Sequence, residues 1–137
     1  MDLHNQILVS RGLSPVAAGT DNTAYVSQII DTANFSATEF LILIGANTDA
    51  DATFTVLVED GDNSALSDNA AVADAYLLGT EALASFTFAD DNETRKIGYI
   101  GSKRYVRVTI TPAGNAAGDI FIAGCWIQAG ARVQPQA

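Results

Sequence analysis

Hydrophobic and polar residues alternate in short runs along most of the chain. In residues 104–111 the apolar side chains Val106, Val108 and Ile110 fall on one face, and residues 53–59 repeat the pattern. A period of two is typical of a strand with one buried face. Similar runs bounded by Gly, Asp and Asn predict further strands at residues 6–10, 25–30, 39–45, 85–88, 95–100 and 120–128. About eight strands at this spacing predict an all-β fold, either a sandwich or a barrel.

Two of the predicted strands have very few polar positions. They are residues 40–44 and 120–127, the second of which contains Cys125 and Trp126. Strands that are apolar at nearly every position are expected where both faces of the strand are covered. The second cover would be a loop of the same chain or another subunit.

Three other segments predict connections rather than long strands. Residues 89–93 read as the loop of a hairpin between Phe88 and Arg95, and residues 112–118 as a longer connection. The alanine-rich residues 68–83 predict either a short helix, with Val72, Tyr76 and Leu77 on one side, or an ordered loop.

The length of 137 residues predicts one domain with a core of its own. Residues 1–16 are expected to form an N-terminal arm or an edge strand, and residues 130–137 a C-terminal tail. The first residues lack the basic and apolar parts of a secretory signal, and no apolar run approaches the ~18 residues of a membrane span. We therefore expect synthesis in the cytoplasm and no membrane partner.

Few residues are available for catalysis. The single Cys125 excludes an internal disulfide, and with His4 it is too little for a four-ligand zinc site. His4 is the only histidine, and a nucleophilic triad would depend on it. The Gly101-Ser102-Lys103 tripeptide is similar to the end of a phosphate-binding loop, but Gly98 stands at the wrong spacing and a strand follows. The two glycines are interpreted as a bulge and a tight turn. We expect no enzyme activity and no cofactor.

Two acidic segments begin like calcium loops. They are residues 49–53 and 60–64, and both lack later ligand positions of such a loop. Solvated acidic turns are the favoured interpretation, while a calcium loop of another design stays open.

Charge is distributed unevenly. The chain has 16 acids and seven bases, with a net charge of −9, which argues against nucleic acid as a partner. Residues 1–94 hold 15 of the acids and one base, whereas five bases lie within residues 95–107. These bases either pair with acids of the same chain or form a basic stripe that docks on an acidic neighbour. The candidate interface residues are Arg95, Lys96, Lys103, Arg104, Tyr105 and Arg107.

The same segment carries a resemblance to a known family. Residues 95–108, RKIGYIGSKRYVRV, and residues 53–63, TFTVLVEDGDN, followed by Leu66-Ser67-Asp68, resemble capsid decoration (cement) proteins of tailed bacteriophages. The resemblance extends from about Met1 to Trp126. It implies a jelly-roll-like β-sandwich that binds the shell of the major capsid protein and clamps neighbouring capsomers, and no catalytic residue is carried over with it.

The resulting expectation is a structural protein on the capsid surface of a virion. It would be made in the host cytoplasm, would self-associate as a dimer or trimer, and would use residues 1–12 and the basic stripe for contacts. The alternative is a carbohydrate- or receptor-binding β module of a phage tail appendage. A small hydrolase that depends on His4 is a third hypothesis.

Overall fold

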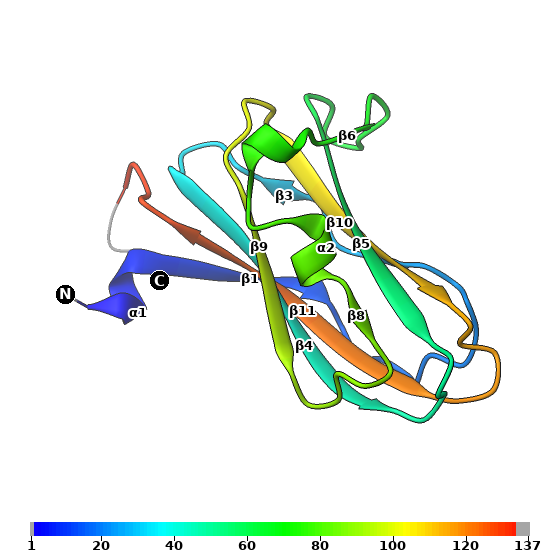
Figure 1. Ribbon diagram of the computed structural model, residues 1–137. Coiled ribbons are helices and arrows are strands. Elements are labelled where there is room, and N and C mark those ends of the chain that lie inside the picture. The colour runs from blue at the N-terminus through cyan, green and yellow to red at the C-terminus, as the bar shows by residue number, and fades with distance from the viewer. Residues whose placement is uncertain (1, 134–137) are drawn as a thin grey trace.

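Two antiparallel β-sheets pack face to face in the computed structural model, which describes residues 2–133 (Figure 1). Sheet A has the order β1 (Ile7–Leu13), β11 (Ile120–Ala129), β4 (Ala37–Asn47), β9 (Thr94–Tyr99) and β7 (Leu77–Leu78). Sheet B has the order β2 (Tyr25–Val26), β10 (Tyr105–Ala113), β5 (Thr53–Gly61) and β6 (Ala70–Ala71), with β3 (Ile30–Asp31) also on β10 and β8 (Phe86–Thr87) on β5. The helical segments are short: α1 (Leu3–Gln6), η1 (Asp74–Tyr76) and α2 (Glu81–Ala84).

The order of the strands confirms the predicted jelly-roll-like sandwich. Along the chain, β1, β4, β9 and β11 belong to sheet A and alternate with strands of sheet B. The late strand β11 lies between β1 and β4, and the late strand β10 lies between β2 and β5. This winding of strand pairs across two sheets defines a jelly roll.

The core is formed by the inward side chains of both sheets. Phe40 of β4 meets Trp126 of β11 edge to face, with ring centroids 4.7 Å apart, and both are buried. The Trp126 indole N–H donates to the Gln28 carbonyl at 3.0 Å, so its one polar group is satisfied. On the other sheet Phe54 stacks on Phe86 at 4.8 Å. Val106, Val108 and Ile110, which the alternation predicts on one face, are all buried in this core.

Three local predictions differ from the structure. The predicted strand at residues 25–30 is split into β2 and β3, because the side chain of Ser27 enters the ladder and accepts from the Val108 N–H at 2.9 Å. Residues 89–93 are not a hairpin loop, since β8 belongs to sheet B and β9 to sheet A. The bulge predicted at Gly98 is also wrong, because Gly98 pairs with Glu39 in regular register.

The alanine-rich segment is an ordered loop with a short helix. Gly79 has a φ of +81°, which no right-handed helix can include, and α2 begins only after the Thr80 side chain accepts from the Leu83 N–H at 3.0 Å. Of the side chains expected on one side, Val72 and Leu77 are buried and Tyr76 is exposed. The continuous helix alternative is therefore not formed.

This loop covers the outer edge of β5. The Val56 N–H donates to Ser85 Oγ at 3.0 Å and the Val58 N–H donates to Glu81 Oε1 at 2.7 Å. The Val58 carbonyl accepts from the Val72 N–H at 3.0 Å. Side chains and short strands thus complete the hydrogen bonds of a strand that would otherwise be an open edge.

The N-terminal segment forms α1 and then the edge strand β1. Ile7 pairs with Ala129, and Figure 1 shows α1 and the start of β1 extending beyond the rest of the sandwich at the end where β11 finishes. Part of the predicted tail, residues 134–137, lies outside the described residues. Within residues 2–133, no helix combines the length and hydropathy needed to cross a membrane.

Candidate interaction surfaces

The predicted interface residues do not lie on one surface. On β9, Arg95 is on the core side at the end of the sheet, beside Ile42, whereas Lys96 points outward beside Leu41. Lys103 and Arg104 lie in the connection to β10, and Tyr105 and Arg107 point outward from sheet B. Because consecutive strands of a jelly roll alternate between sheets, neighbours in the sequence are separated in space.

Four of the five bases form ion pairs with acids of the same chain. Arg95 pairs with Glu93 at 2.7 Å and with Asp90 at 3.3 Å. Lys103 pairs with Asp62 at 3.2 Å, Arg104 with Asp31 at 2.9 Å and Arg107 with Glu59 at 3.0 Å. Internal pairing is what the first interpretation of the basic segment expects. The role of the six residues in an interface stays a prediction.

The Arg104–Asp31 pair is bidentate but exposed. Arg104 Nε donates to Asp31 Oδ1 at 3.0 Å and Nη2 to Oδ2 at 2.9 Å. The hydrogen bonds from Arg104 hold the pKa of the Asp31 carboxyl below its usual range. Both side chains are about half exposed, so the pair contributes little to stability and Arg104 remains accessible to a partner.

Tyr99 holds the connection that carries Lys103 and Arg104. Its hydroxyl donates to Asp60 Oδ2 at 2.7 Å and accepts from the Lys103 N–H at 3.0 Å. Burial, and then the bond to Asp60, raise the pKa of Tyr99 above its ordinary value. A Cβ on Gly101 would lie 2.5 Å from this hydroxyl, so the tyrosine closes over a position that only glycine fits. The motif that is similar to a phosphate-binding loop is thus a structural turn.

Sheet A exposes an apolar outer face. Its outward positions on β4 and β11 are almost all hydrophobic, and they continue onto the edge strands. The exposed large hydrophobic side chains on this face are Val9 (56%), Leu43 (57%), Leu78 (54%) and Phe121 (47%). The apolar face comprises these four with Ile7, Arg11, Glu39, Leu41, Thr94, Lys96, Ala123, Cys125, Ile127 and Ala129.

The apolar face is arranged in rows across the strands. One row runs from Arg11 through Cys125 and Leu41 to Lys96, so that a base stands at each end. Beside Leu41 and Leu43 the face has a shallow depression of about 230 Å³. Burial raises the pKa of the Cys125 thiol, which is consistent with its apolar surroundings.

The outer face of sheet B is different in character. Its outward positions on β5 and β10 include Thr53, Thr55, Thr109 and Thr111 and the Arg107–Glu59 pair across the two strands, together with Leu57 and Tyr105. Threonine and paired charges are ordinary for a solvated sheet face. The outer face of sheet B is therefore mixed and more polar than that of sheet A. The sequence indicated the apolar face of sheet A through the uniformly hydrophobic residues 40–44 and 120–127.

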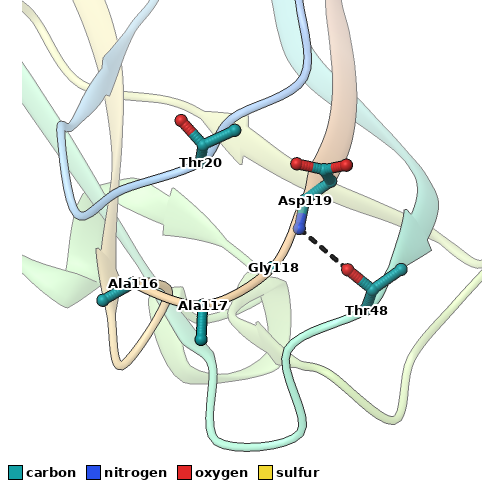
Figure 2. A pocket seen from close by; sticks show the side chains of 6 residues that line it. All are labelled: Thr20, Thr48, Ala116, Ala117, Gly118 and Asp119. Atoms are coloured by element: carbon teal, nitrogen blue, oxygen red, sulfur yellow. Dashed lines mark hydrogen bonds between the residues drawn. The ribbon is translucent and has the colours of Figure 1, made fainter.

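A polar hollow of about 380 Å³ lies between loops at one end of the sandwich. Figure 2 shows Thr20, Thr48 and Asp119 around it, with Ala116, Ala117 and Gly118 forming its wall. The Asp119 N–H donates to Thr48 Oγ1 at 2.8 Å, while the Asp119 side chain is exposed. The lining offers hydroxyl and carboxylate groups.

The acidic turns use their carboxylates to hold the backbone. Asp49 accepts from the Asp51 N–H at 3.1 Å and from the Ala117 N–H at 2.9 Å. Asp68 accepts from the Asp62 N–H at 2.8 Å. In the described part of the chain no three His, Cys, Asp or Glu side chains are grouped as a metal site would need.

Comparisons with known proteins support the fold and leave the family open. No protein-family model matches the sequence, and no curated protein matches it either. Among solved structures, the chain is similar to the PBSX exported protein XepA, with a TM-score of 0.52 and 14% identity over 97% of this chain. It is also similar to a chain of the infectious bursal disease virus Gx strain structure, with a TM-score of 0.50 and 8% identity over 93% of this chain.

The chain spans only part of these two proteins, 39% and 34% of their respective lengths. A carbohydrate-binding module, CBM35 from Paenibacillus barcinonensis, matches over 86% of both chains with a TM-score of 0.39 and 13% identity. At these identities the first two matches show a shared β-sandwich fold and no more.

Proposed function

We propose that this protein is a structural component of a phage virion that binds the outside of the major capsid protein shell and bridges capsomers. The observation that carries the proposal is the apolar face of sheet A, which contrasts with the more polar outer face of sheet B. A contiguous exposed apolar patch is expected where a protein is built into an assembly. In this role the protein is not an enzyme and needs no cofactor.

Further support comes from the sequence and from the ends of the fold. Residues 53–63 and 95–108 resemble decoration proteins of tailed phages. In the structure residues 53–63 form β5 and the turn after it. Residues 95–108 form most of β9, the first part of β10 and the connection between the two strands, which the Tyr99 hydroxyl holds in place. The free edge of β1 and the segment before it provide backbone groups that a second protein can pair with.

The direct test is binding to shells that lack a decoration protein. Purified protein is incubated with such shells and sedimented, and the particles are then exposed to heat or low salt. We expect saturable binding and increased resistance. Protein that neither sediments with the shells nor changes their resistance would contradict the proposal.

The predicted basic contact is tested in the same assay. The Arg104→Glu variant is expected to weaken attachment, because Arg104 is exposed and its pairing with Asp31 is weak. Arg132→Glu makes the same change in charge at another exposed site and serves as the control. Equal occupancy of both variants on the shells would reject Arg104 as a contact.

A carbohydrate- or receptor-binding module of a tail appendage is the second candidate. The polar hollow lined by Thr20, Thr48 and Asp119 favours it, because hydroxyl and carboxylate groups hydrogen-bond to sugar hydroxyls (Figure 2). This function predicts saturable glycan binding that Asp119→Asn weakens. If the protein bound no glycan on an array, either with or without calcium, this candidate function would be rejected.

A further inference from the structure

We infer that the apolar face of sheet A packs against the same face of a second copy, which makes a two-fold symmetric dimer. The inference goes beyond the proposed function, because it assigns the apolar face to a contact between two copies and not to the shell. The free edge of β1, the N-terminal segment before it and the connection between β9 and β10 that carries Arg104 then remain available for attachment to the shell.

The size of the face suits a small, reversible dimer interface. Its outward residues extend over about eight steps of 3.3 Å on β4 and β11, over about four steps on β1 and β9, and over one residue on β7, with strands about 4.8 Å apart. Each copy would therefore bury on the order of 400–450 Å², and the pair about 800–900 Å² in total, which lies at the low end of protein–protein interfaces.

The charge of the face favours a second copy. The chain has a net charge of −9, so most approaches of two copies bring acids together. On the apolar face Glu39 is the one acid among the outward residues named above, and it is accompanied by the bases Arg11 and Lys96. Two copies can therefore meet on this face without the repulsion that the remaining surface imposes.

The pattern of the face is also self-complementary. Glu39 and Lys96 lie on neighbouring strands in adjacent rows, since Lys96 pairs with Leu41. Consider a two-fold axis that lies in the interface, perpendicular to the strands, between the row that contains Glu39 and the row that contains Lys96. This axis places Lys96 of each copy opposite the Glu39 row of the other copy. Sheets that pack face to face in this way form a dry layer about 10 Å thick, as inside a sandwich.

The first test is the mass of the purified protein in solution. Light scattering after gel filtration is expected to give a dimer for the wild-type chain. Leu43→Glu, at a 57% exposed position, is expected to raise the dimer dissociation constant at least about 10-fold, because each copy buries the new charge. Val26→Glu is the matched control on the outer face of sheet B, where the exposed fraction is 51%. It should leave the dimer unchanged.

Cys125 provides a second measurement on the unmodified chain. It is the single cysteine and lies in the middle of the apolar face, between Arg11 and Leu41. Its rate of reaction with a maleimide should fall as protein concentration rises, and Leu43→Glu should abolish that dependence. Circular dichroism confirms that each variant is folded.

The outcomes separate this inference from the proposed function. A monomeric wild-type protein, or a Leu43→Glu variant that remains dimeric, would overturn the inference even if shells are bound. Monomeric wild-type protein whose binding to shells is lost in Leu43→Glu would assign the face to the shell instead. A dimer that binds no shells would overturn the proposed function and leave the inference standing.

Discussion

Removing one hydroxyl, in Tyr99→Phe, tests the account of the connection between β9 and β10. In the wild-type protein this hydroxyl satisfies the Asp60 carboxylate at 2.7 Å and the Lys103 N–H at 3.0 Å. Both partners lose a hydrogen bond in the variant while the ring stays in place. A hydrogen bond to a charged group and an unsatisfied N–H together predict a loss of about 2 kcal/mol in the free energy of unfolding at pH 7.

The pH dependence gives the prediction a second, independent part. The pKa of Tyr99 is raised in the folded state, so folding favours the protonated hydroxyl. Its contribution is complete below the unfolded value near 10 and is lost as the pH rises from there towards the folded pKa. Between these two pKa values the folded protein retains one proton that the unfolded chain has lost. The free energy of unfolding therefore falls by about 1.4 kcal/mol per pH unit. Tyr99→Phe removes this component, whereas that of Tyr25, whose pKa burial also raises, remains.

Urea unfolding between pH 7 and pH 11 measures both parts. The fluorescence of Trp126, the single tryptophan, reports unfolding because the side chain is buried. Tyr76→Phe is the control, since Tyr76 is 52% exposed and its hydroxyl has no hydrogen bond within residues 2–133. A Tyr99→Phe variant as stable as wild type, or with an unchanged alkaline slope, would refute the reasoning.

Three further predictions concern other parts of the fold. Gly114→Ala should lower the thermal stability of the protein more than Gly79→Ala does. Both glycines have a positive φ. A Cβ on Gly114 would lie 2.7 Å from the Asp51 carbonyl oxygen, whereas the atom nearest to a Cβ on Gly79 is 4.0 Å away. Equal losses of stability in the two variants would contradict this, because they would show that the positive φ alone sets the loss and that the close contact of Gly114 adds nothing. Ser85→Ala should cost about 1–3 kcal/mol in urea unfolding, because the Val56 N–H on the covered edge loses its acceptor; Ser102→Ala is the exposed control. Arg104→Glu should change stability by less than about 1 kcal/mol. Arg107→Glu should cost more than about 2 kcal/mol, because Glu59 is largely buried beside it, and the reverse ranking would contradict the assigned burial.

The strands could be predicted from the sequence because one buried face imposes a period of two. Predicted residues 53–59 and 120–128 became β5 and β11 with ends shifted by at most two residues. The pairing of the strands could not be predicted in this way. Residues 89–93 resembled a hairpin loop locally, but β8 and β9 find partners in different sheets, far away in the sequence.

The candidate surfaces show the same limit. The bases of residues 95–107 are close together in the sequence, yet Lys96 and Arg107 lie on the outer faces of opposite sheets. The hydrophobic residues 40–44 and 120–127 were a better signal, because a strand in a two-layer fold has only one face towards the core. Their second face is the exposed apolar face, which only the three-dimensional arrangement could reveal.

The position of β11 constrains the order in which the molecule can mature. This strand occupies the centre of sheet A, between β1 and β4, although it is made after all the other described strands. During synthesis on the ribosome, β1 therefore lacks its partner until β11 has emerged. The same strand brings Phe121, Cys125 and Ile127 to the face that contains Leu41 and Leu43. A chain interrupted before β11 lacks the β11 side of the apolar face, so the inferred contact between two copies would select molecules that contain this strand.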